Sequence, residues 1–425
     1  MSWTSRTLGE ICDEVKGVIQ TGPFGSQLHE SDYVREGVPV VMPKNIVDGR
    51  ISTEEIAFVS EQNANRLQRH MLAVGDIVYG RRGDIGRRAL ITEREHGWLC
   101  GTGCLRVSLG NTIIDPMFLY YYLGESSVTK RIANQAIGAT LPNLNTSILR
   151  SVPARYPSLA SQRQIASILS AYDELIENNA RRIKILEKMA QMIYREWFVN
   201  FRFPGHEKVK MIGSELGTIP QDWHVSRIQD FGQVITGKTP PKERAEFFGG
   251  EIPFIKLPDM HGKVFVLDTV EHLSAIGEEY QRTKTLPANS LCVSCIGTAG
   301  IVVITMRRSQ TNQQINSVVL NTIAEREFLY FRLLDLKETI NRYGYNGATM
   351  VNLNKNKFEN LRVVRPTSQL LGKYHDMVFP MFQSILNLQQ RNTNLEKTRD
   401  LLLPKLISGE ISVETAEKQA VAQGA

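Results

Sequence analysis

The sequence predicts an α+β protein in which one unit, a globular domain followed by a long helix, occurs twice in tandem. Three observations predict it: an internal repeat, the same order of β-type and helical patterns in both halves, and a single apolar stripe on each long helix. We expect the two helices to pack together as an antiparallel coiled coil, which would give the tandem repeat a pseudo-twofold axis.

The repeat is clearest in an eight-residue segment. GATLPNLN, from Gly138 to Asn145, recurs as GATMVNLN, from Gly347 to Asn354, with six of eight positions identical and an offset of 347 − 138 = 209. Further matches follow in the same order in both halves: Trp3 with Trp223, 38–41 with 252–255, 72–77 with 286–291, and 118–121 with 328–331. A collinear series of this kind indicates a tandem duplication.

Short β-type runs punctuated by Gly and Pro precede each long helical stretch. In the first half they are 38–41, 76–79 and 89–92, and in the second half 252–255, 290–296 and 301–305. Each half is therefore expected to form an α+β domain.

Each helical stretch has one apolar stripe with alternating spacings of three and four. The first helix is expected to begin near Ser161 and to run towards Trp197. Its stripe is interrupted by Asn179, and the second is interrupted by Asn392. About 35 residues make a rod of roughly 50 Å, longer than one domain covers, so we expect the helices to pack on each other. The stripes are Ile165, Leu169, Tyr172, Ile176, Ile183, Leu186, Met189 or Ala190, Ile193 and Trp197, and then Tyr374, Val378, Met381, Ile385, Leu388, Leu395, Leu402 and Leu406.

Composition is compatible with this fold and limits the class of protein. The 425 residues suffice for at least two domains, and the net charge of +6 permits an anionic partner without requiring one. Five cysteines, an odd number, suggest reduced thiols. Because there is neither a long apolar run nor a signal-peptide pattern, we expect a cytoplasmic protein without a membrane partner.

Several stretches resemble the specificity subunit of Type I restriction-modification systems. They are 157–165 at the entry to the first helix, 195–201 at its exit, 216–223 before the second domain, 237–240, and 403–411 near the end. Two departures stand out. Residues 366–371 lack the Leu-x-x-Gln register of the first helix entry, and 21–25 differ from 236–240.

The resemblance implies two target-recognition domains, each reading one part of a split, asymmetric double-stranded DNA sequence. It implies a non-catalytic chain that binds two methyltransferase subunits and motor-nuclease subunits, with S-adenosylmethionine, ATP and Mg²⁺ on those partners and no cofactor on this chain. The predicted divisions are 1–157 and 221–366 for the recognition domains, 158–200 and 367–408 for the helical regions, 201–220 for a linker, and 409–425 for a tail.

Candidate DNA contacts lie in both halves, because Lys and Arg bind phosphates while Arg, Asn and Gln also read base edges. Four arginines occupy the glycine-rich segment 80–88, and an amide-rich segment spans 311–316. A solvated charge cluster or an ordinary polar turn would explain these segments equally well. The candidates are Lys44, Asn45, Arg81, Arg82, Arg87, Arg88, Lys256, Asn312, Gln313, Gln314 and Asn316.

The repeated GAT motif has a different character, because residues that read different DNA sequences should differ between the halves. Near-identity suggests a shared task, so we expect a joint between domain and helix or a contact with another subunit. The candidates are Gly138, Thr140, Asn143, Asn145, Gly347, Thr349, Asn352 and Asn354.

Rival functions have weaker support. Residues 232–239 match the phosphate-loop pattern, but Pro240 and Pro241 oppose the helix that such a loop requires. Cys292 and Cys295 should point to opposite faces of a strand, so we expect no metal site. Pro258-Asp259 suggests a nuclease only weakly, and no methyltransferase motif is found, so we expect no catalytic residues. A specificity subunit of another restriction type, or a non-catalytic coiled-coil scaffold, remains an alternative.

Overall fold

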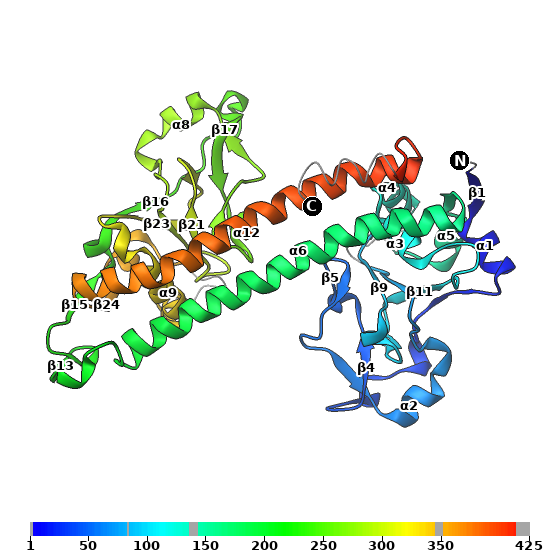
Figure 1. Ribbon diagram of the computed structural model, residues 1–425, viewed down its shortest axis with the longest axis horizontal. Coiled ribbons are helices and arrows are strands. Elements are labelled where there is room, and N and C mark those ends of the chain that lie inside the picture. The colour runs from blue at the N-terminus through cyan, green and yellow to red at the C-terminus, as the bar shows by residue number, and fades with distance from the viewer. Residues whose placement is uncertain (1–2, 83–84, 136–142, 345–351, 414–425) are drawn as a thin grey trace. The chain divides into compact units, whose positions relative to one another are not determined.

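The structure, a computed structural model, describes residues 3–82, 85–135, 143–344 and 352–413. The chain divides into two compact units, Met1–Leu175 with Asn394–Ala425, and Ile176–Thr393. Each unit therefore combines a globular part with a stretch of both long helices, α6 (Leu159–Tyr194) and α12 (Ser368–Ser408) (Figure 1). In the part of the chain that the structure describes, every helix is too short or too polar to span a lipid bilayer.

The globular part of the first unit contains two four-stranded sheets. One has the order β2-β11-β8-β9 and the other β10-β4-β7-β3, while β1 pairs with β12 and β5 with β6. The strands are β1 (Thr4–Thr7), β2 (Val18–Thr21), β3 (Tyr33–Val34), β4 (Val38–Val41), β5 (Ile46–Val47), β6 (Arg50–Ile51), β7 (Ala57–Val59), β8 (Ile77–Gly80), β9 (Arg88–Leu90), β10 (Leu99–Cys100), β11 (Cys104–Ser108) and β12 (Pro153–Tyr156). The short helices are α1 (Leu8–Glu14), α2 (Glu61–Arg66), α3 (Pro116–Gly124), α4 (Ser126–Gln135) and α5 (Thr146–Ser151).

The second unit repeats this plan. Its main sheet has the order β16-β23-β20-β21-β18, its second sheet β19-β17-β22, and β15 pairs with β24. The strands are β15 (His224–Arg227), β16 (Gly232–Thr236), β17 (Phe248–Ile255), β18 (Phe265–Val266), β19 (His272–Leu273), β20 (Leu291–Ser294), β21 (Val302–Thr305), β22 (Gln310–Thr311), β23 (Ile315–Leu320) and β24 (Arg362–Arg365). The short helices are α7 (Leu257–Met260), α8 (Ala275–Tyr280), α9 (Arg326–Asp335), α10 (Lys337–Gly344) and α11 (Lys355–Glu359).

The corresponding elements confirm the tandem duplication and the α+β class. Every β-type run expected from the sequence overlaps a strand, and the repeated aromatic segments form α3 and α9. Residues 201–220, expected as a linker, contain a hairpin of β13 (Met211–Ser214) and β14 (Gly217–Pro220). Of the expected tail, residues 414–425 lie outside the described part.

Helix α6 begins two residues before the expected Ser161. Ser158 provides the cap, because its hydroxyl oxygen accepts from the Ser161 amide at 3.3 Å and its carbonyl from the Gln162 amide at 2.9 Å. The sequence pattern thus placed the wrong serine at the cap. At its other end α6 continues into a π-helical turn, Arg195–Val199.

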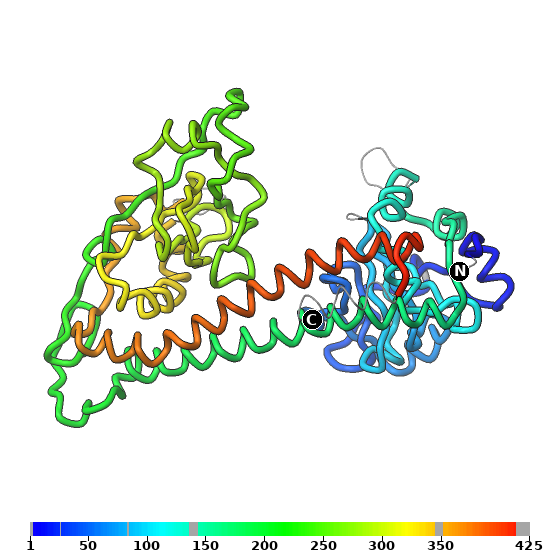
Figure 2. Tube along the Cα trace, turned by 45° about the horizontal axis from the view of Figure 1, so that its top comes forward, coloured from blue at the N-terminus to red at the C-terminus, as the bar shows by residue number. Residues whose placement is uncertain are grey.

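Within each unit the two helices run antiparallel and touch. In the second unit the Tyr374 hydroxyl donates to the Ala190 carbonyl at 3.2 Å. In the first unit Arg399 pairs with Asp173 at 2.5 Å, where the end of α12, red in Figure 2, lies beside the beginning of α6. From one contact to the other, the residue number rises along α12 and falls along α6, so the expected antiparallel pairing is confirmed.

The apolar stripes face the domains as well as the partner helix. Ile165 and Leu169 share a core with Leu402, and Tyr194 shares one with Val378. At the ambiguous position in the first stripe, Ala190 is fully buried while Met189 is 46% exposed. Each helix therefore belongs to the cores of both units.

Gln162 explains the glutamine at the first helix entry. It is fully buried, its Nε2 donates to the carbonyls of Ile113 (3.1 Å) and Pro157 (3.0 Å), and its Oε1 accepts from the Asp115 amide at 2.8 Å. At the equivalent position, 162 + 209 = 371, Leu371 is buried in the apolar core instead. In the second half, apolar packing of Leu371 thus takes the place of the hydrogen bonds that Gln162 makes in the first half.

Candidate DNA interface

In each unit, several loops leave the same edge of the main sheet. The strands of β2-β11-β8-β9 are antiparallel, with Thr21 opposite Leu105, Cys104 opposite Gly80, and Tyr79 opposite Arg88. Consequently, four strand ends meet at one edge of the sheet: the end of β2, the start of β11, the end of β8 and the start of β9. We call residues 22–24, 81–82, 85–88 and 101–103 the first loop edge, and residues 237–241, 295–301 and 312–314 the second loop edge.

Backbone hydrogen bonds join the loops of the first edge. The Arg81 amide donates to the Gly103 carbonyl at 2.8 Å, and the Gly22 amide donates to the Cys104 carbonyl at 2.9 Å. The Thr102 hydroxyl closes the edge by donating to the Pro23 carbonyl at 2.8 Å.

The second edge is joined in a corresponding way. The Gly237 amide donates to the Ile315 carbonyl at 3.1 Å, the Lys238 amide to the Thr311 carbonyl at 2.9 Å, and the Cys295 amide to the Gln314 carbonyl at 2.8 Å. The two edges are therefore versions of one framework that carry different side chains.

The four arginines of the first edge fall into two classes. Arg81 and Arg88 make contacts within the protein. Arg81 Nε donates to the Leu144 carbonyl at 3.0 Å. Arg88 donates to the Tyr120 carbonyl at 3.0 Å, and its guanidinium lies over the Tyr120 ring. Arg82 and Arg87 are exposed. The structure thus brings all four to one edge but leaves only two facing solvent.

Lys44 and Asn45 lie next to this edge, in the short turn Pro43–Asn45 after β4. Pro43 packs against Gly103, where an added Cβ would lie 3.1 Å from its ring. The Lys44 side chain is 57% exposed and reaches Glu55 at 3.2 Å.

Asn45 is only 1% exposed and its amide is fully engaged. It accepts from the Met42 amide at 3.0 Å and donates to the carbonyls of Ser52 and Glu54, each at 3.3 Å. Asn45 therefore supports the turn, and its role as a base contact stays a prediction. Asp259 does the same in the second unit, accepting from the amides of Lys256 (2.9 Å) and Val270 (3.1 Å).

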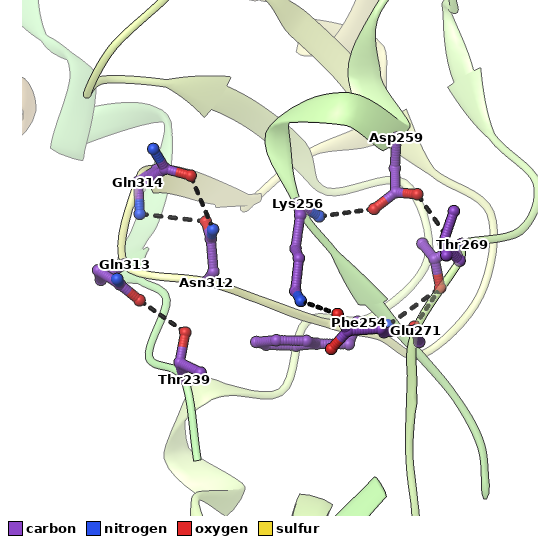
Figure 3. A network of polar contacts seen from close by, with 10 residues as sticks. Thr239, Phe254, Lys256, Asp259, Thr269, Glu271, Asn312, Gln313 and Gln314 are labelled. Atoms are coloured by element: carbon purple, nitrogen blue, oxygen red, sulfur yellow. Dashed lines mark hydrogen bonds and ion pairs between the residues drawn. The ribbon is translucent and has the colours of Figure 1, made fainter. Parts of the chain in front are cut away.

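The amides of the second edge lie in the loop before β23, which corresponds to residues 101–103 of the first edge (Figure 3). Asn312 Oδ1 accepts from the Gln314 amide at 3.1 Å while its Nδ2 donates to Gln314 Oε1 at 2.9 Å. Gln313 is exposed, and its Oε1 accepts from the Thr239 hydroxyl at 2.7 Å. The adjacent Lys256 pairs with Glu271 and lies 5.4 Å from the centre of the Phe254 ring.

Two candidate asparagines, Asn312 and Asn316, are buried and hydrogen-bonded within the protein. Asn312 is 7% exposed with both ends of its amide bonded. Asn316, 2% exposed, accepts from the Thr236 hydroxyl at 2.6 Å and donates to the Leu353 carbonyl at 3.1 Å. Both asparagines are buried, whereas Gln313 and Gln314 are the accessible amides of this segment, and base contact by any of the four stays a prediction.

The repeated motif connects each loop edge to a short helix. The Leu144 amide donates to the Arg81 carbonyl at 2.9 Å, and the Leu353 amide to the Cys295 carbonyl at 3.0 Å. The next residue in each copy, Asn145 or Asn354, caps α5 or α11.

The residues before these leucines join the same connection. Asn143 forms a β-bridge with Arg82, and Asn352 forms one with Ile296. These contacts explain why Asn-Leu-Asn recurs in both halves. A role at a subunit contact stays a prediction, and Gly138, Thr140, Gly347 and Thr349 lie outside the described residues.

Sequence reasoning missed a buried pair of glutamines behind the second edge. Gln281 Nε2 donates to the Lys238 carbonyl at 2.8 Å and to Gln310 Oε1 at 2.7 Å. Gln310 Nε2 in turn donates to the Glu278 carbonyl at 3.1 Å. The pair holds the Lys238 loop in place. Gln281 and Gln310 are 29 residues apart, so no local sequence pattern links them.

Two rival sites lack a feature that they would need. After β16 the chain continues as a non-helical loop through Pro241, so the phosphate-loop match lacks the helix that it needs. Cys292 and Cys295 lie in separate hydrophobic cores, and burial raises the pKa of their thiols to about 12 and about 11. Among the described residues, His, Cys, Asp and Glu side chains nowhere gather in a group of three or more that could hold a metal ion.

Comparison with known proteins agrees with this architecture. The family model described as the Type I restriction modification DNA specificity domain matches twice, at residues 2–188 and 220–396. The HindI specificity subunit of Haemophilus influenzae is 30% identical, with 79% of this chain and 86% of the relative covered. The MjaIX specificity subunit of Methanocaldococcus jannaschii is also 30% identical, over 70% of this chain and 69% of the relative.

A solved structure has the same fold. The S subunit of a Type I restriction-modification system from M. genitalium superposes with a TM-score of 0.58 at 19% identity, covering 96% of each chain. The duplicated domains, the antiparallel helices and the double family match lead to one conclusion: the chain belongs to the family of Type I restriction-modification DNA specificity subunits.

Proposed function

We propose that the chain reads a divided, asymmetric DNA target, with one part contacted by each loop edge. The observation that carries the proposal is one framework with two sets of side chains. Arg82 and Arg87 are exposed at the first edge, and Gln313 and Gln314 are accessible at the second. Arginine binds phosphates or guanine and glutamine binds base edges, so the two edges should prefer different sequences.

The helices supply the spacing in this proposal. Both α6 and α12 contribute to the core of each unit, and side chains such as Tyr374 join them directly. A helix advances about 1.5 Å per residue, so their length and register would set the separation of the two half-sites.

Catalysis belongs to partner subunits in this account. The family membership and the name of the HindI relative support a chain that assembles with two methyltransferase subunits and with motor-nuclease subunits on double-stranded DNA. S-adenosylmethionine, ATP and Mg²⁺ would act on those partners. This chain itself would bind no cofactor.

The test is to map methylated bases in DNA from cells that carry this chain with its methyltransferase subunit. The expected motif has two specified parts separated by unspecified bases, and the two parts differ. A continuous palindromic motif would contradict the proposal, as would methylation without sequence preference.

A further inference from the structure

We propose that Gln314 determines one base of the target, and that it reads guanine because it presents hydrogen-bond donors to the groove. The inference rests on the proposed function of the second loop edge. It goes beyond that function by naming the residue, the polarity of its contact and the base.

The orientation of the Gln314 amide follows from a chain of hydrogen bonds. The backbone N–H of Gln314 can only donate, so the Asn312 side-chain atom 3.1 Å from it must be the oxygen Oδ1. The other end of Asn312 is then Nδ2, which can only donate. Its partner 2.9 Å away must therefore be Oε1 of Gln314. This leaves Nε2, which carries two N–H groups, as the end of Gln314 without a hydrogen-bond partner among the described residues (Figure 3).

The surroundings hold Gln314 in place and leave room beside it. Its carbonyl accepts from the Cys295 amide at 2.8 Å, which ties the residue to the neighbouring loop. Gly297, with φ +78°, faces the side chain, and a Cβ added there would lie 3.9 Å from Nε2. The side chain is half-buried and belongs to the loop edge, so it is fixed in position while Nε2 remains available.

Base chemistry then selects the partner. In the major groove guanine offers two acceptors, N7 and O6, whereas cytosine offers only a donor. Glutamine usually recognises adenine by donating to N7 and accepting from N6. Here Asn312 already occupies Oε1, which weakens the accepting half of that pair. A side chain that offers mainly donors therefore favours guanine.

The experiment maps methylated motifs for the complete chain and its methyltransferase subunit, comparing the unmodified protein with Gln314→Ala and Gln314→Glu. Gln314→Ala should relax one guanine position in one half-site by roughly tenfold or more, the size of a lost base contact. Gln314→Glu replaces donors with acceptors, so the same position should turn against guanine. Gln233→Ala, an exposed glutamine at the opposite end of β16, should leave the motif unchanged.

A second variant, Asn312→Asp, changes which end of the Gln314 amide is free without replacing Gln314 itself. Asn312→Asp keeps an acceptor for the Gln314 amide but removes the donor that holds Oε1, so Gln314 is free to turn and accept. The same position should then admit adenine. This substitution separates base reading from a purely structural role for Gln314.

The inference is overturned if Gln314→Ala leaves the motif intact, relaxes a position that is not guanine, or weakens all positions equally. Failure of the proposed function looks different. In that case the unmodified protein itself yields a continuous palindrome or no motif.

Discussion

Asn179 of α6 donates from Nδ2 to Oδ1 of Asn392 of α12 over 2.8 Å, inside the helix pair of the second unit. Asn392 also donates to the Ile176 carbonyl at 3.1 Å. These are the two residues that interrupt the apolar stripes, and in the structure they are partners. A polar pair in an apolar seam is satisfied in only one register, so it specifies alignment at some cost in stability.

Removing one member of this pair should destabilise the protein. In Asn179→Ala the Asn392 oxygen loses its donor, and we expect the free energy of unfolding to fall by about 1–3 kcal/mol. Joint replacement of Asn179 and Asn392 by leucine should recover that loss, because no polar group remains unpaired. Denaturant unfolding checks both variants, with exposed Arg181→Ala as the control. Equal stability of Asn179→Ala and the unmodified chain would contradict the role.

Gln162 should be a second sensitive position. Gln162→Ala leaves the Asp115 amide and the carbonyls of Ile113 and Pro157 without their side-chain hydrogen bonds. Each unsatisfied group costs about 1–3 kcal/mol, so we expect the free energy of unfolding to fall by several kcal/mol. Thermal unfolding measures it. Gln164→Ala, exposed on the same helix, is the matched control. Similar unfolding temperatures for the two variants would show that the Gln162 side chain does not stabilise the start of α6.

Arg82 and Arg81 should have separable effects. Arg82→Ala removes an exposed cation, so DNA affinity should fall and the slope of log affinity against log salt should shrink by about 1. Arg81→Ala should also lower stability, because the Leu144 carbonyl loses its side-chain donor. Salt titrations of DNA binding by the assembled methyltransferase, together with unfolding curves, distinguish these effects. An unchanged salt slope for Arg82→Ala would remove it from the interface.

The cysteines should resist alkylation in the folded protein. All five are buried, and the raised pKa values of Cys292 and Cys295 keep both thiols protonated at pH 8. Iodoacetamide should therefore label them only after unfolding, as mass spectrometry would detect. Rapid labelling at pH 8, or bound zinc, would contradict the assignment of Cys292 and Cys295 to separate cores.

The fold could be predicted from the sequence because duplication leaves the same signal twice. Paired segments such as 118–121 and 328–331 identify corresponding elements, and the helical spacing of Tyr374 and Val378 reports a buried face. Local rules were less reliable at the start of α6, where Ser158 and Ser161 are equally good caps by type. Tertiary contacts decided between them.

The sequence named the candidate residues but could not divide them by role. Asn45, Asn316 and Gln313 are all polar residues close to loops, and only burial separates the supports from the accessible side chain. Gln281 escaped notice because its partners are distant in sequence. Hydrogen bonding across such separations has no periodic pattern for a sequence to reveal.

The central claim is that each loop edge contacts its own part of the target. Footprinting of the assembled methyltransferase on its methylated sequence, with the unmodified chain, Arg82→Ala and Gln314→Ala, tests this most directly. We predict two protected patches separated by an unprotected gap, with Arg82→Ala weakening one patch and Gln314→Ala the other. A single continuous patch, or loss of the same patch in both variants, would contradict the account.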